Sequence, residues 1–135
     1  MGTIYASMFL TLDGVMEAPH VWHPAYVSEE SRTVLAEQMA SATAMLLGRR
    51  TYDDFAGYWP YQPSEVPLAH ATNSIRKYVV SRTLSAPGWN KTTVLDAGLV
   101  AAVRVLKEQG AQRPGAGRCS AGAGVAARTP PTESR

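Results

Sequence analysis

Short β-prone segments that alternate with helical patterns constrain the fold of this chain more than any other feature. The β-prone segments cover residues 4–10, 44–47, 77–81 and 92–95. Ser28 and the two glutamates after it are typical of a helix start, a short helix is predicted over residues 51–58, and Asp96 is predicted to cap a last helix. Strands that alternate with helices favour a mainly parallel sheet with crossover helices. The sequence therefore predicts an α/β fold.

Length and charge limit the size of the fold and the kinds of partner. The 135 residues suffice for at most one domain, and a hydrophobic content of 45% is compatible with a packed core. A net charge of +2 gives no electrostatic reason to expect nucleic acid or a membrane as a partner. There is no pattern of a secretory leader or of a bilayer-spanning segment. The single cysteine, Cys119, fits a reducing compartment, so we expect a cytoplasmic protein.

The composition changes abruptly near residue 110. Residues 110–135 contain 18 Gly, Ala, Arg or Pro among 26 positions, against 32 among the preceding 109. Cys119 and Val125 are the only appreciable apolar side chains there, too few to offset the entropy of ordering the segment. We therefore expect one domain over residues 1–109 and a disordered tail over residues 110–135. Two explanations of the tail stay open: a change of reading frame in a G/C-rich gene, or a natural flexible extension.

The strand-to-helix junction LLGRRTY, residues 46–52, is the first candidate site. A helix start carries backbone N–H groups without intrahelical partners and a partial positive charge. Arg49, Arg50 and the Thr51 hydroxyl add donors, and Gly48 allows a tight turn and the close approach of a ligand. The junction predicts a phosphate site, although a solvated basic helix start has the same pattern.

A second candidate site lies at the end of the third predicted strand. This strand delivers Ser81, Arg82 and Thr83 at its carboxyl end, where ligands collect in open α/β sheets. Because Arg49 also follows a strand, Arg49 and Arg82 are expected on the same side of the sheet, where they could share an anionic ligand. The alternative is a pair of unrelated surface arginines.

Asp13 is the candidate catalytic residue. It follows the first predicted strand, and its carboxylate could orient a polar substrate or a proton source. It could equally hydrogen-bond the backbone of its own turn. His20, His23 and His70 lack the spacing of a metal-ligand set, so we expect no metal site.

Three segments together resemble one family in their order and spacing: residues 7–14 (SMFLTLDG), 46–52 (LLGRRTY) and 77–83 (KYVVSRT). The family is the dihydrofolate-reductase-like superfamily, and within it the group similar to the reductase domain of riboflavin biosynthesis. The resemblance covers roughly residues 3–109. It implies a mixed, mainly parallel sheet flanked by helices, NADPH as the hydride donor, and a small pteridine-like or aminouracil-like substrate.

The resemblance also implies roles for individual residues. Two turns would hold the phosphates of the cofactor: Gly48, Arg49, Arg50 and Thr51 in the first, and Ser81, Arg82 and Thr83 in the second, which would grip the 2′-phosphate end of the adenosine. Asp13 would lie beside the nicotinamide and the substrate.

The chain departs from the family pattern after the last helix. Family members continue with another strand and a glycine-rich turn that cradles the pyrophosphate. No apolar strand is predicted after Gln109, and no predicted strand precedes the glycines at residues 122–124, so we expect a truncated sheet. The leading hypothesis is an NADPH-dependent reductase that resembles 5-amino-6-(5-phosphoribosylamino)uracil reductase or dihydrofolate reductase. The alternative is an inactive remnant that binds nucleotide weakly or only pairs with a partner chain, with a homodimer as the candidate assembly.

Overall fold

The structure, a computed structural model, describes residues 3–111 and 118–121. Five strands form one sheet in the order β1-β5-β2-β3-β4, and all four strand pairings are parallel. The strands are β1 (Thr3–Ala6), β2 (Ala44–Gly48), β3 (Arg76–Val80), β4 (Thr92–Leu95) and β5 (Arg118–Ala121). The predicted α/β fold with a mainly parallel sheet is confirmed.

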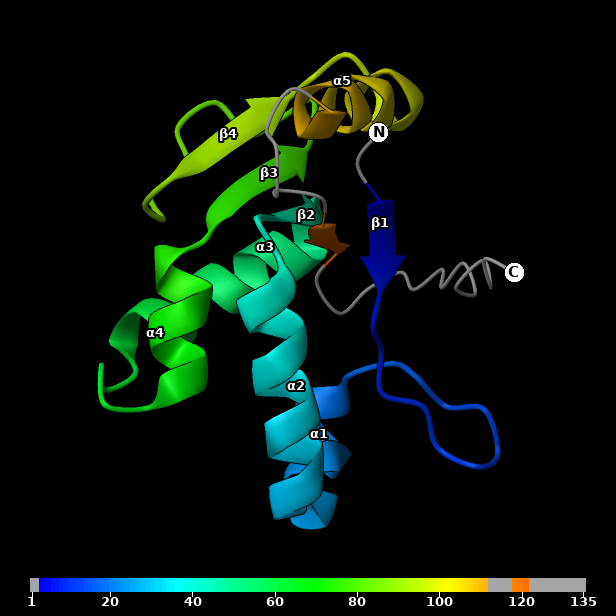
Figure 1. Cartoon of the computed structure of the whole chain (residues 1–135), viewed down its shortest axis with the longest axis vertical. Coiled ribbons are helices and arrows are strands. Elements are labelled where there is room, and N and C mark those ends of the chain that lie inside the picture. Colours follow the sequence, from blue (N-terminus) through cyan, green and yellow to red (C-terminus); the bar gives the residue numbers. More distant parts are fainter. Residues whose placement is uncertain (1–2, 112–117, 122–135) are drawn as a thin grey trace.

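Helices cover both faces of this sheet. The α-helices are α1 (Pro19–Trp22), α2 (Glu29–Ser41), α3 (Arg49–Ala56), α4 (Pro67–Ser74) and α5 (Leu99–Ala111), and the 3-10 segments are η1 (His23–Tyr26) and η2 (Trp59–Tyr61). Figure 1 shows α5 on one side of the strands, at the top of the view, and α2, α3 and α4 on the other. No helix in the part of the chain that the structure describes is long and apolar enough to cross a membrane.

The hydrophobic core has two parts because successive side chains of β2 point to opposite faces of the sheet. Met45 and Leu47 belong to one buried cluster, against which residues of α2 and α3 pack. Ala44 and Leu46 belong to the other, which is covered by Leu106 of α5. A strand that is buried on both faces is expected in a parallel sheet with helices on each side, and it explains why this segment is continuously apolar.

One charged side chain is buried with the core. Lys77 on β3 has no exposed surface, and its ammonium group donates to the carbonyl oxygens of Asn73 at 3.0 Å and Ile75 at 2.9 Å. Asn90 accepts two further, longer hydrogen bonds from the same nitrogen. The Lys77 ammonium thus ties the carboxyl end of α4 to the turn before β4. Burial, and secondarily the nearby charge of Lys91, lowers the pKa of Lys77 from 10.5 to about 8.

Several boundaries differ from those that the sequence predicts. β1 ends at Ala6 rather than Leu10, and α3 begins at Arg49, two residues before the predicted start at Thr51. The prediction that Asp96 caps the last helix is wrong, because α5 begins only at Leu99. Gly98, with a φ of +89°, makes the turn before this helix, and its carbonyl accepts from the backbone N–H of Ala102.

The helix start at Ser28 is confirmed. The Ser28 hydroxyl accepts from the backbone N–H of Ser31 at 3.1 Å, and the Ser31 hydroxyl accepts from the backbone N–H of Ser28 at 3.0 Å. This reciprocal pair satisfies two backbone donors at the start of α2. Two helices, α1 and α4, are not predicted from the sequence, and both have a proline in their first turn.

Two short parts of the tail expected over residues 110–135 belong to regular elements: residues 110–111 end α5, and residues 118–121 form a strand. Residues 118–121 form β5, which lies between β1 and β2 and pairs with both. The expectation that no strand precedes the glycines at residues 122–124 is therefore wrong, because β5 ends directly before them. A segment with few apolar side chains is a strand here because its backbone pairs on both sides. The predicted disorder of residues 112–117 and 122–135 falls outside the described residues and stays a prediction.

Candidate functional site

The candidate site lies where β2 and β3 end side by side. In the parallel register of these strands Gly48 pairs with Val80, so both strands end at the same edge of the sheet. The polypeptide enters α3 after Gly48, and it enters an irregular turn at Ser81 after Val80. The topology therefore brings the two predicted phosphate turns together, as expected for the carboxyl ends of neighbouring parallel strands.

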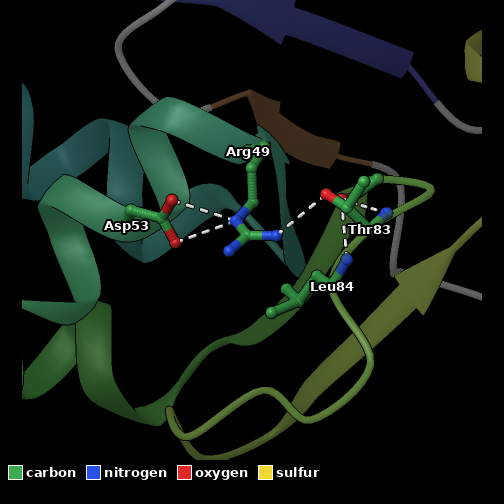
Figure 2. A network of polar contacts seen from close by, with 5 residues as sticks. Arg49, Asp53, Thr83 and Leu84 are labelled. Carbon is green, nitrogen blue, oxygen red and sulfur yellow. Dashed lines mark hydrogen bonds and ion pairs between the residues drawn. The ribbon is translucent and has the colours of Figure 1, made fainter.

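Arg49 joins the two turns directly. It is the first residue of α3, and its Nη1 donates a hydrogen bond of 3.2 Å to the hydroxyl of Thr83. Its Nε donates to both carboxylate oxygens of Asp53, at 3.0 and 2.9 Å. Figure 2 shows the Arg49 guanidinium between Asp53 on the helix and Thr83 on the turn. No hydrogen-bond partner of its Nη2 lies among the residues that the structure describes.

Ser81 organises the second turn. Its hydroxyl oxygen accepts from the backbone N–H groups of Thr83 at 3.2 Å and Leu84 at 3.1 Å, and its side chain is buried. This is the hydrogen-bonding pattern by which a serine stabilises a turn. Both acceptor positions of the oxygen are occupied, and the Thr83 hydroxyl lies 3.4 Å from it, so the Ser81 hydroxyl is used within the turn that presents Arg82 and Thr83.

Gly48 leaves open space at the start of α3. A Cβ atom built on Gly48 would meet no atom within 4 Å. The φ of Gly48 is −77°, which any residue adopts, so the backbone of this turn does not depend on a glycine, and the predicted close approach of a ligand stays a prediction. Gly48 has no side chain that could cap the helix, and the first backbone N–H groups of α3 therefore remain for water or a ligand.

The other residues that are predicted to bind phosphate lie near the ends of β2 and β3, but their side chains do not connect the two strand ends. Arg50 and Arg82 are exposed, and Thr51 is half-buried in the first turn of α3. No hydrogen bond or ion pair joins these three side chains to another described residue. Tyr52, the next residue of α3, is buried instead, and its hydroxyl accepts from the backbone N–H of Trp89 at 3.2 Å. The buried tyrosine fixes α3 against the sheet, so the backbone that carries Arg49 and Arg50 is held in place.

Asp13 does not contact the other predicted site residues. It is exposed in the turn after β1, and its Oδ1 accepts from the Thr11 hydroxyl. The turn is closed by a hydrogen bond of 2.8 Å from the backbone N–H of Val15 to the same hydroxyl and by Gly14 with a φ of +94°. The Asp13 side chain is thus held by Thr11 rather than by the turn backbone. Within the described part of the chain, no hydrogen bond or ion pair joins it to Arg49 or Thr83.

Nothing in residues 3–111 and 118–121 gathers into a metal site. No three His, Cys, Asp or Glu side chains in these ranges come together where they could hold a metal ion. His23 is engaged in another way, because its ring stacks on that of Phe9 with 3.5 Å between the ring centroids. Burial lowers the pKa of His23, which favours its neutral form.

Asp53 is a site residue that is not predicted from the sequence. Its signal is the spacing of four residues from Arg49, which brings an arginine and an acid together on one helix face. A helix that is predicted to begin at Thr51 does not include Arg49, so the prediction does not bring Arg49 and Asp53 onto one helix face. The donor set at the edge is otherwise cationic or neutral, and it suits an anion such as a phosphate.

A comparison with protein families identifies the chain. No curated protein matches it significantly. A family model described as the RibD C-terminal domain matches residues 2–113, which is most of the chain, and the match includes β1 to β4 and the helices between them. The chain therefore belongs to the RibD C-terminal domain family, the dihydrofolate-reductase-like reductase domain of riboflavin biosynthesis.

Proposed function

We propose that this chain is an NADPH-dependent reductase that acts on a pteridine-like or aminouracil-like substrate. The observation that carries the proposal is the Arg49 guanidinium, which bridges the ends of β2 and β3 and keeps Nη2 free of hydrogen bonds to described residues. A fixed guanidinium at this edge is suited to a phosphate, because its planar donors match phosphate oxygens. Membership in a reductase-domain family supports the same cofactor class.

The residues present fit the phosphates of such a cofactor. Arg49 and the exposed Arg82 supply positive charge, and the Thr83 hydroxyl and the start of α3 supply neutral donors. The carboxylate of Asp53, which contacts this set, is paired with Arg49. When bound, NADPH supplies the hydride. The role of the protein is to hold the nicotinamide and the substrate in the relative positions that hydride transfer requires.

Asp13 is the proposed residue on the substrate side. Its Oδ1 is held by Thr11, and Oδ2 has no hydrogen-bond partner among the described residues. A carboxylate that is fixed through one oxygen can accept a hydrogen bond from a polar substrate through the other, or deliver a proton if it is protonated. In this proposal the Asp13 carboxyl orients the substrate and takes part in proton transfer, while the hydride comes from the cofactor.

A second proposal is that the chain associates with a second copy of itself. Within the described residues β1 pairs only with β5, which leaves its other edge unpaired. Large apolar side chains are also exposed in the segment that follows β1, with Leu12 and Val21 fully or largely open to solvent. Unpaired strand edges and exposed apolar side chains both favour association between chains. This observation favours the alternative of a remnant that pairs with a partner.

The experiment that separates these functions is a titration of the chain with NADPH, followed by tryptophan fluorescence. Trp89 lies against Tyr52 of α3, with 6.1 Å between the ring centroids, so its emission reports on this helix. We expect quenching that saturates as NADPH is added, and consumption of NADPH when an acceptor of the aminouracil or pteridine class is present. No saturable quenching at millimolar NADPH would refute the reductase proposal and favour the remnant.

A further inference from the structure

We infer that Asp53 is a positioning residue, which holds the Arg49 guanidinium in the orientation from which it meets a cofactor phosphate. The inference rests on the proposed function, because it concerns how the same edge of the sheet binds its ligand. It assigns to Asp53 no contact with the cofactor.

The geometry gives the guanidinium two attachments from two different elements. Asp53 lies one helical turn further along α3, and its two carboxylate oxygens accept hydrogen bonds from the Arg49 Nε at 3.0 and 2.9 Å. Thr83 lies on the turn after β3, and its hydroxyl oxygen accepts a hydrogen bond from the Arg49 Nη1 at 3.2 Å. Two attachments at different nitrogens determine both the position and the rotation of a planar group. Nη2 then remains as the nitrogen without a hydrogen-bond partner among the described residues, and no dashed line reaches it from the side chains drawn in Figure 2.

Thr83 is itself held in place by Ser81, the residue that follows β3. The backbone N–H of Thr83 donates to the Ser81 hydroxyl at 3.2 Å, and the two hydroxyl oxygens lie 3.4 Å apart. Ser81 is buried at the end of β3, so the position of the acceptor for Arg49 is tied to the sheet. The chain of contacts from Ser81 through Thr83 and Arg49 to Asp53 therefore links the sheet to α3.

The Arg49–Asp53 ion pair contributes little to the stability of the fold. Both side chains are substantially exposed, with 40% and 52% of their surfaces open to solvent. Exposed ion pairs of this spacing contribute little to folding, because water and salt screen the charges. Arginine has a long side chain whose freedom is lost when it binds a phosphate, and a side chain that is ordered beforehand loses less on binding. The pair therefore serves ligand binding better than it serves the fold.

The sign of the effect separates positioning from simple electrostatics. Asp53 carries a negative charge near the expected phosphate, so as a charge alone it would weaken NADPH binding, and its removal would strengthen it. As a positioning residue it strengthens binding, and its removal weakens it. Asp53→Asn keeps an oxygen that can accept from Nε but loses the charge, whereas Asp53→Ala loses both.

The experiment measures the dissociation constant of NADPH by tryptophan fluorescence for the full chain and four variants. Asp53→Ala should bind NADPH roughly three- to tenfold more weakly, the cost of ordering one long side chain at binding. Asp53→Asn should bind at least as tightly as the original chain. Asp54→Ala is the matched control, because it removes the same charge from the adjacent position of α3, and it should not weaken binding. The fourth variant is Arg49→Ala.

A double-mutant cycle adds a readout that a merely structural role would not move. If Asp53 acts through Arg49, adding Asp53→Ala to Arg49→Ala should cause no further loss of NADPH affinity, and the melting temperature of Asp53→Ala should stay close to that of the original chain. Equal or tighter NADPH binding by Asp53→Ala would overturn the inference while leaving the proposed function intact. Failure of the original chain to bind NADPH would instead refute the proposed function and this inference with it.

Discussion

The ammonium group of Lys77 lies over the ring of Trp89, 4.2 Å from its centroid, and both side chains are buried. The Trp89 indole N–H donates to the Asn73 side chain at 2.9 Å, and the Lys77 ammonium donates to the Asn73 backbone carbonyl. The three residues thus connect β3, the carboxyl end of α4 and the turn before β4. This cluster forms the polar part of the core on the face of the sheet that α3 covers.

Lys77 should make the stability of the protein rise with pH in the alkaline range. Its pKa is about 8 in the folded protein and near 10.5 when exposed, so between these values the unfolded chain binds more protons. The free energy of unfolding should therefore increase from about pH 8 to about pH 10.5, by up to roughly 3 kcal/mol. Urea denaturation across this pH range gives the free energy of unfolding of the original chain and of Lys77→Met. The difference between the two pH profiles is the contribution of Lys77.

Lys91→Gln provides the control for this prediction. It removes the neighbouring positive charge that helps to lower the pKa of Lys77, so the rise in stability should begin at a higher pH. Identical pH profiles of the original chain and Lys77→Met would contradict the account of the buried ammonium group.

The sequence predicts those parts of the fold that depend on local signals. The bounds of β4, residues 92–95, and the cap at Ser28 agree with the structure, because a β-branched segment and a capping serine act over a few residues. The burial of Lys77 could not be predicted, since lysine is rarely buried and its acceptors come from α4 and residue 90. Arg49 was predicted as a site residue, whereas its contact with Thr83, 34 residues away, depends on the pairing of β2 with β3.

Arg82 should determine the preference for NADPH over NADH. It is exposed on the turn after β3, and its guanidinium is proposed to contact the 2′-phosphate. Because a charge-assisted contact contributes about 1.5–3 kcal/mol, Arg82→Ala should weaken NADPH binding by roughly one to two orders of magnitude. The dissociation constant of NADH should change much less. Equal losses for the two dinucleotides would exclude Arg82 from the 2′-phosphate.

The edge of β1 that has no partner strand among the described residues, and the exposed side chains after β1, should cause association. We expect the mean molar mass from light scattering to rise with protein concentration, because Leu12 and Val21 expose apolar surface. Leu12→Ser should reduce this association, whereas Glu30→Gln, an exposed change on α2, should leave it unaltered. A constant monomer mass at all concentrations would contradict the proposed second copy.

The hypothesis of a reading-frame change predicts what the gene encodes after codon 109. The family match ends at residue 113, close to the change in composition at residue 110. One of the other two frames should encode an apolar strand, then a glycine-rich turn and an amphipathic helix. Translation of the gene sequence provides the check, and a chain with that frame restored should bind NADPH more tightly. If neither frame encodes this pattern, the hypothesis of a reading-frame change is refuted and the tail needs an explanation of its own.

The most direct test of the account is calorimetric titration of NADPH into the original chain and into Arg49→Ala. Arg49 bridges the two strand ends, so its loss removes the charge and the link to Thr83 together. We predict saturable binding of one NADPH per chain, weakened roughly tenfold or more in Arg49→Ala. Thr33→Ala, an exposed change on α2, should bind like the original chain. Equal affinity of the original chain and Arg49→Ala would contradict the placement of the cofactor phosphates at this edge of the sheet.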